Sequence, residues 1–230
     1  MPKFLNLFGC ILLFTCAGMS CKSLLKPARI YELNVQGFRV IANVDSLEHP
    51  EITTALRVID SKLYQFRSIL PEKQFRALQG VPIWIEWNAY EQGAARYVES
   101  RWQCFQERVA FEKAGGIEIY NLRNFFDWQE HSQPYALMHE LAHAYHHRVL
   151  GSKNKDVINA YKHAVQFRKY EMVANGTAGI DRAYALTNAD EYFAELSEAY
   201  LGKNDFYPFN RSQLMTYDSV GYELMKKIWE

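Results

Sequence analysis

Two histidines four positions apart, His139 and His143, restrict the fold of this chain more than any other feature of its sequence. In a segment of helical character, residues four apart lie on one face, so both imidazoles can take two corners of a zinc tetrahedron. Glu140 lies next to that face, where its carboxylate can act as a general base on a metal-bound water without binding the metal. Chance produces this pattern in roughly one such sequence in 60. The segment therefore predicts a helix with two zinc ligands, and the remaining ligand must be sought elsewhere.

A catalytic zinc site needs a third protein ligand and an open position for water. A third histidine six positions after His143 is excluded, because Val149 occupies that position. The other arrangement takes a carboxylate from a later helix, and the strongly patterned candidate is the segment 188–196. Its Glu191 and Glu195 lie one helical turn apart, so one can bind zinc while the other hydrogen-bonds a ligand from outside the coordination shell. A solvated acidic helix face is the alternative.

Three segments of the chain resemble, in this order, the catalytic domain of anthrax lethal factor and its relatives, among them the Pro-Pro endopeptidases and exported bacterial peptidases. The segments are His139-Glu140-Leu141-Ala142-His143, Tyr184-Ala185-Leu186-Thr187-Asn188 and Glu191-Tyr192-Phe193-Ala194-Glu195. The resemblance spans about residues 116 to 201. The chain departs from lethal factor at Ala142, where lethal factor has Gly. That difference touches no ligand and favours the helix slightly.

The resemblance implies a zincin-like metallopeptidase domain of the α+β class, with a mixed β-sheet, an active-site helix and a following helix that bears a glutamate ligand. It implies one Zn²⁺ ion held by His139, His143 and Glu191, which leaves Glu195 as the carboxylate outside the coordination shell. The same match makes Tyr184 the tyrosine whose hydroxyl stabilises the tetrahedral intermediate.

Periodicity in the rest of the chain predicts a mixed α+β fold. Residues 30–43 alternate in strand fashion around a Gln36-Gly37 turn, which indicates a β-hairpin. Residues 49–70 place apolar side chains at three- and four-residue steps, the period of a helix, and Pro71 ends that helix. Further strands are predicted at 81–87 and 115–121, and further helices at 135–149, 155–172 and 190–201, the last being the final clear helix.

Several residues outside the three segments carry weaker signals. The strand at 115–121 lies where related zinc peptidases place the edge strand that pairs with the substrate backbone, with an ordinary interior strand as the alternative. His146 and His147 follow His143 by three and four positions. We expect them in solvent or hydrogen-bonded outside the coordination shell, because Glu191 already completes the ligand set in the resemblance. Cys104 is expected to be a lone thiol without a catalytic partner.

The first 21 residues have the composition of an export signal. A short positive start is followed by an apolar run that is too short to span a bilayer comfortably, and then by small residues where a signal peptidase could cut. Cys21 stands where a bacterial lipoprotein signal would place an acylated cysteine, so a lipid anchor and simple cleavage both remain open. The mature chain, residues 22–230, is predicted to form a single domain that is secreted or held at a membrane through Cys21.

The charge balance limits the partners of the protein. With 26 basic and 26 acidic side chains, nothing suggests nucleic acid or an anionic membrane surface as a partner. The sequence therefore predicts an exported, monomeric, zinc-dependent metallopeptidase that acts on a peptide or protein substrate, with endopeptidase activity expected. Two alternatives remain: a catalytically inactive zinc-binding module, and a zinc hydrolase of a non-peptide ester or amide.

Overall fold

The computed structural model describes residues 30–43, 50–87, 90 and 92–230. The predicted export signal at residues 1–21 lies outside the described residues, so its cleavage and the acylation of Cys21 stay predictions. Within the described part of the chain, no helix combines the length and the apolar composition that crossing a bilayer requires.

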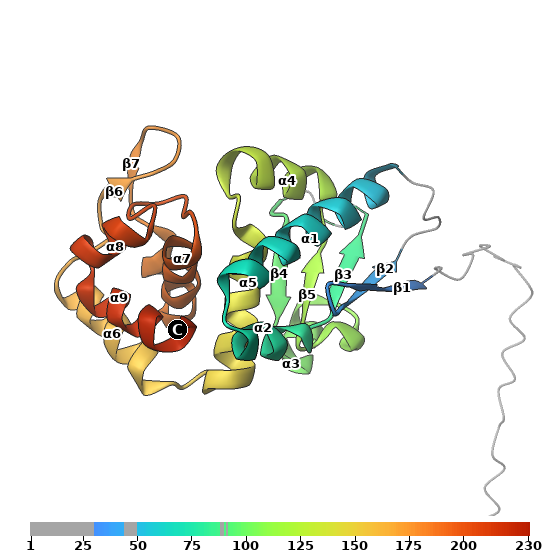
Figure 1. The fold of residues 1–230 in the computed structure, drawn as a ribbon, viewed down its shortest axis with the longest axis horizontal. Coiled ribbons are helices and arrows are strands. Elements are labelled where there is room, and N and C mark those ends of the chain that lie inside the picture. Colours follow the sequence, from blue (N-terminus) through green and yellow to red (C-terminus); the bar gives the residue numbers. More distant parts are fainter. Residues whose placement is uncertain (1–29, 44–49, 88–89, 91) are drawn as a thin grey trace, which may run out of the picture.

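The elements follow one another along the chain as helices, strands and short helical turns (Figure 1). In order they are β1 (Ile30–Val35), β2 (Phe38–Asn43), α1 (Pro50–Ile69), α2 (Glu72–Gln79), β3 (Ile83–Glu86), β4 (Ala95–Val98), α3 (Arg101–Glu107), η1 (Phe111–Lys113), β5 (Gly116–Ile119), α4 (Leu122–Asp127), η2 (Trp128–Ser132), α5 (Ala136–Tyr145), η3 (His146–Gly151), α6 (Lys155–Gln166), β6 (Val173–Ala174), β7 (Ile180–Asp181), η4 (Tyr184–Leu186), α7 (Ala189–Leu201), α8 (Arg211–Tyr217) and α9 (Ser219–Trp229).

Five of the strands form a mixed sheet in the order β1-β2-β3-β5-β4. β1 and β2 form the predicted hairpin, and Gln36 and Gly37 make its tight turn with positive φ angles of 53° and 86°. β2, β3 and β5 run parallel, whereas β4 pairs antiparallel with β5. This mixed sheet and the helices around it confirm the predicted α+β class.

The strand predicted at 115–121 is present as β5, but it is an interior strand and not the edge strand. It lies between β3 and β4, and all four of its residues are buried. The edge strand next to β5 is β4, and β1 forms the opposite edge. The periodicity did not predict β4 because the strand is only four residues long and carries Arg96. Arg96 is accommodated because its guanidinium pairs with Glu118 of β5 at 2.7 Å. The sheet edge nearest to α5 is therefore that of β4.

The two faces of the sheet bury different kinds of side chain. Ile83 of β3 and Ile117 of β5 lie in the main apolar core with residues of α1, α2 and α5. The polar Glu118 is buried with Arg96 and with Lys113, whose Nζ lies 2.7 Å from the Glu118 carboxylate. Because buried charges require partners, these ion pairs balance the charges on this second face, where Val98 of β4 packs with Cys104 of α3. The apolar face receives α1 and α2. α5 packs on that face against β4 and β5.

The predicted helices are present, with changes at their ends. The segment 135–149 forms α5 and continues as the π-helix η3, while the segment 155–172 ends as a helix at Gln166. It ends there because Arg168 and Tyr170 adopt positive φ angles of 53° and 67°, which an α-helix does not allow. The helix at 190–201 is α7, but it is not the last, because α8 and α9 follow it.

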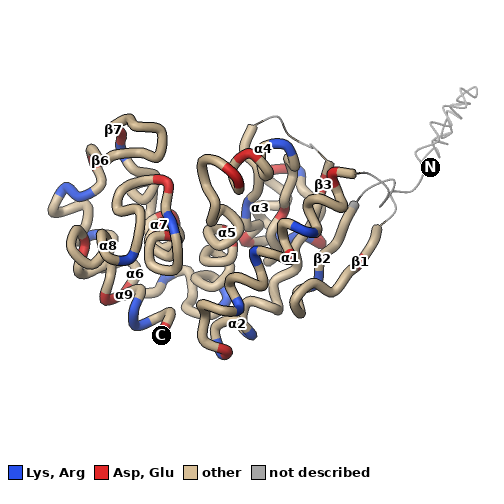
Figure 2. The backbone as a smooth tube through the Cα atoms, turned by 45° about the horizontal axis from the view of Figure 1, so that its top comes forward, with Lys and Arg blue, Asp and Glu red and all other residues tan. Residues whose placement is uncertain are grey.

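The helices α6 to α9 and the small β6-β7 hairpin gather on one side of α5, and the five-stranded sheet with α1 to α4 lies on the other (Figure 1). α5 packs closely against α7. Positions occupied by basic and by acidic residues are spread along both halves of the described chain (Figure 2). The helices that carry the two groups of candidate ligands therefore lie side by side, although about fifty residues separate them in sequence.

Candidate metal centre

α5 presents His139 and His143 on one face. The two rings lie one helical turn apart, with centroids separated by 4.7 Å and planes at 78°, and each side chain is 12% exposed. The opposite side of the helix is fixed by the fully buried Met138, Leu141 and Ala142. Burial of that apolar face leaves the two imidazoles at the edge of the core, where an ion can reach them.

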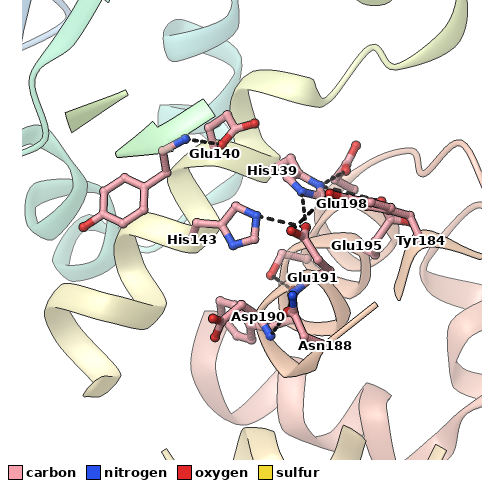
Figure 3. A network of polar contacts seen from close by, with 12 residues as sticks. His139, Glu140, His143, Tyr184, Asn188, Asp190, Glu191, Glu195 and Glu198 are labelled. Carbon is pink, nitrogen blue, oxygen red and sulfur yellow. Dashed lines mark hydrogen bonds and ion pairs between the residues drawn. The ribbon is translucent and has the colours of Figure 1, made fainter. Parts of the chain in front are cut away.

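α7 brings a carboxylate to both imidazoles. The Oε2 atom of Glu191 lies 3.0 Å from His139 Nε2 and 3.1 Å from His143 Nε2 (Figure 3). Glu191 is held in the first turn of α7 because the Asn188 side chain caps the helix, accepting hydrogen bonds from the backbone N–H groups of Asp190 and Glu191 at 2.8 Å each. The helix cap thus sets the position of the carboxylate.

The three groups suit a divalent metal ion. Two imidazole nitrogens and one carboxylate oxygen converge within 4.8 Å of one another, and these donor types match a site with an open position. Burial opposes ionisation of Glu191, but hydrogen bonds from His139 and His143 outweigh burial and hold its pKa well below the usual range. Glu191 is therefore kept in the ionised form that a metal ligand requires.

A second carboxylate contacts the other nitrogen of His139, and it is not the expected one. Glu198 Oε1 lies 2.7 Å from His139 Nδ1, whereas Glu195 Oε1 lies 3.7 Å away, too far for a hydrogen bond. Glu191, Glu195 and Glu198 all face α5, so the spacing of three glutamates along one helix face was the signal that could have revealed Glu198. Burial raises the pKa of Glu198 to about 7, although its hydrogen bond with His139 acts the other way.

Glu140 extends toward the sheet, away from the two histidine rings (Figure 3). Its Oε2 atom accepts a hydrogen bond of 2.6 Å from the backbone N–H of Tyr97 on β4. That N–H is not used in the pairing of β4 with β5 and points outward from the sheet edge. The candidate base is therefore tied to the edge strand and not to the metal ligands.

Tyr184 lies in the short turn η4, directly before α7. Its hydroxyl donates to Glu191 Oε1 at 3.3 Å, and its ring lies 6.3 Å from the ring of His139. Burial, followed by the negative charge of Glu191, raises the pKa of Tyr184 to about 12. The hydroxyl thus stays protonated near neutral pH and remains a hydrogen-bond donor.

These side chains open onto one cavity of about 610 Å³. The sheet side contributes residues of β4 and the ring of Tyr120, and the helical side contributes Tyr184, Glu191 and Phe206. His139, Glu140 and His143 line the cavity between these two sides. All the residues predicted for the site therefore meet in one space that is large enough for part of an extended chain.

The structure also places the residues with weaker sequence signals, His146, His147 and Cys104. His146 is fully buried and His147 is 10% exposed, so neither lies in solvent. Cys104 is a buried free thiol, as expected, and burial raises its pKa. These two histidines form a separate group with Asp190, considered below.

Comparison with known proteins gives a partial result. No family model matches the chain, and no curated protein matches it. Among solved structures, the chain is similar to the Pro-Pro endopeptidase PPEP-2 from Paenibacillus alvei, with a TM-score of 0.46 and 19% sequence identity over 85% of this chain and 99% of that one. Assignment of an activity to this chain therefore depends on the geometry of its side chains.

Proposed function

We propose that this protein is a zinc-dependent peptidase. One observation carries the proposal: His139, His143 and Glu191 direct their donor atoms to a common point on the wall of a cavity that Glu140 and Tyr184 also line. A structural zinc site is normally closed by four protein ligands. Three donors with a cavity in front of them instead leave a position for water, which favours catalysis over an inactive binding module.

The chain's own residues supply the proton transfers. When bound, a zinc ion would supply a Lewis acid that lowers the pKa of a water molecule toward neutrality. Glu140 takes the proton of the attacking water and returns it to the leaving amine, which is general acid–base catalysis by one carboxylate. Tyr184 donates a hydrogen bond to the oxygen on which negative charge develops. Its protonated hydroxyl is suited to that task.

A peptide suits this cavity better than a small ester or amide. The edge strand β4 borders the cavity, and its outward Tyr97 N–H is a main-chain donor of the kind that pairs with an extended peptide. In the free protein this donor is bonded to Glu140. A substrate strand that pairs with the Tyr97 N–H would release the Glu140 carboxylate as it binds. The base would therefore become free to accept a proton only when the substrate is in place.

The test is cleavage of a proteome-derived peptide library by the wild-type chain loaded with zinc. Glu140→Gln should keep its zinc and lose about 10²- to 10⁴-fold in kcat, the usual contribution of a general base. The matched control is Glu112→Gln, an exposed glutamate on η1 away from the cavity, which should retain wild-type kcat. Turnover that survives Glu140→Gln would overturn the proposed base. Zinc binding without peptide turnover in the wild type would indicate the binding module or an ester or amide hydrolase.

We also propose that the protein is exported, because residues 1–21 have the composition of an export signal. Anchoring through Cys21 is the second form of this proposal. Mass spectrometry of the mature amino terminus tests both forms. An acylated Cys21 supports the anchor, an unmodified terminus after residue 21 supports secretion, and an intact Met1 terminus in the native host would contradict export.

A further inference from the structure

A second group of histidines lies directly after the candidate metal centre. The π-helix η3 begins with His146 and His147, and both approach Asp190 at the start of α7. His146 Nδ1 lies 2.9 Å from Asp190 Oδ1, and His147 Nε2 lies 3.4 Å from Asp190 Oδ2. The three groups can each offer a donor atom within 4.8 Å of the others. Short π-helical segments occur frequently at functional sites.

The burial of His146 makes an ordinary ion pair an incomplete account of this group. Its side chain has no exposed surface, and within the described residues neither ring nitrogen has a hydrogen-bond partner. The Asp190 oxygen is close to Nδ1, but the contact does not have the direction of a hydrogen bond. A buried polar atom without a partner destabilises the folded state. An ion between Nδ1 and the carboxylate would supply the missing partner.

The surroundings of His147 repeat a pattern seen at the first site. On the side away from Asp190, His147 Nδ1 lies 3.2 Å from Glu99 Oε1, close enough for an ion pair but without the direction of a hydrogen bond. His139 likewise has Glu191 on its Nε2 side and Glu198 on its Nδ1 side. Histidines that bind metals usually direct the second ring nitrogen to a carboxylate, which fixes the ring and raises its basicity.

We propose that His146 Nδ1, His147 Nε2 and the Asp190 carboxylate bind a second divalent metal ion of the class that prefers imidazole and carboxylate ligands, with zinc as the representative. Because Oδ1 faces His146 and Oδ2 faces His147, Asp190 can bind through both oxygens, which brings the number of donor atoms to four. Asp190 directly precedes Glu191 in α7. The second ion therefore fastens the start of α7 to η3 and is structural, in contrast to the ion at the cavity.

Metal content tests this proposal independently of any enzymatic activity. The full chain is loaded with zinc chloride and freed of excess metal. Its zinc content per chain is then measured by inductively coupled plasma mass spectrometry. The wild type should hold two ions per chain, Glu191→Gln one, and Glu191→Gln with His147→Gln none. His131→Gln is the matched control, since His131 also faces an aspartate, with Nδ1 3.3 Å from Asp127, but on an exposed surface. It should leave two ions.

Thermal unfolding gives a second reading. In the Glu191→Gln background, zinc chloride should raise the melting temperature, and adding either His147→Gln or Asp190→Asn should abolish that rise. One ion per wild-type chain would overturn the proposal and leave a plain ion pair. A second ion or a zinc-dependent rise that persists in both His147→Gln and Asp190→Asn would overturn the ligand assignment. If neither added variant folds, the wild-type stoichiometry of two or one still decides.

Discussion

The two walls of the cavity hold their carboxylates in different ways. At the β4 wall, Glu140 of α5 accepts one hydrogen bond from the uncharged backbone N–H of Tyr97. On the α7 wall, Glu191 faces two imidazoles and has a lowered pKa. The first carboxylate is held by a contact that a substrate strand can replace, and the second by contacts that belong to the protein. In the proposed mechanism, this difference separates a group that exchanges protons from a group that binds the metal ion, although both are glutamates in one cavity.

The largest effect is expected from the α7 wall. Glu191→Gln should remove the zinc ion of the cavity site and abolish peptide turnover, because it removes one of three donors and the charge that balances that ion. Zinc content and turnover are measured on the same samples. Glu140→Gln is the comparison, since it should abolish turnover and leave the metal in place. If Glu140→Gln lost the zinc while Glu191→Gln kept it, the roles of the two walls would be reversed.

The second-largest effect, a loss of kcat, is expected from the tyrosines that line the two walls of the cavity. Tyr184→Phe should lower kcat by about 10²- to 10³-fold with zinc content unchanged, because it removes a donor that acts mainly in the transition state. Tyr120→Phe is its counterpart, from the end of β5 beside the β4 wall. Steady-state kinetics on one cleaved peptide measure both. A greater loss of kcat for Tyr120→Phe than for Tyr184→Phe would indicate that the hydroxyl of Tyr120, beside the β4 wall, is the transition-state donor.

The parts of the fold that the sequence predicts are those with a local signal. The hairpin at 30–43 and the helix α1 each repeat their period within a single segment, and both have nearly the predicted bounds. β4 has four residues and a charged side chain, and its pairing depends on Glu118, about twenty residues away. No local pattern reveals such a strand, so the sequence offered only the strand at 115–121 as a candidate for the edge, with an interior strand as the alternative.

The candidate site shows the same limit. His139, Glu140 and His143 stand together in sequence and on one helix, so spacing alone identifies them. The choice of Glu191 over Glu195 came from the resemblance, and Glu198 was missed. Which carboxylate of α7 meets His139 depends on how α7 lies against α5, a contact between distant segments. Spacing narrows the candidates to one helix face, and packing selects among them.

The carboxylates behind His139 allow a finer test of the α7 wall. Glu198→Gln should weaken zinc binding by about 10- to 100-fold, the usual effect of removing a partner of a metal-binding histidine. Glu195→Gln should weaken it less, because its nearest oxygen lies 3.7 Å from Nδ1 and is not hydrogen-bonded to it. Competition with a chelator of known affinity measures both dissociation constants. A larger loss for Glu195→Gln would restore the original expectation from sequence.

The smallest effect is expected from the Asn188 side chain that caps α7. The variant tests whether this cap holds Glu191 in position. Asn188→Ala removes the acceptor of the Glu191 backbone N–H and should lower the free energy of unfolding by about 1 kcal/mol. Asn154→Ala is the matched control, since Asn154 caps α6 in the same manner, through Asp156 and Val157, away from the cavity. Urea unfolding of the metal-free chains should show similar losses for both.

The two cap variants, Asn188→Ala and Asn154→Ala, should differ only in their affinity for zinc. Asn188→Ala lets the first turn of α7 fray, so the Glu191 carboxylate must be ordered again when it binds the ion. Zinc affinity should therefore fall by roughly fivefold, the equivalent of about 1 kcal/mol, whereas Asn154→Ala should leave it unchanged. Equal zinc affinities in the two variants would mean that contacts with α5, and not the helix cap, hold Glu191 in place.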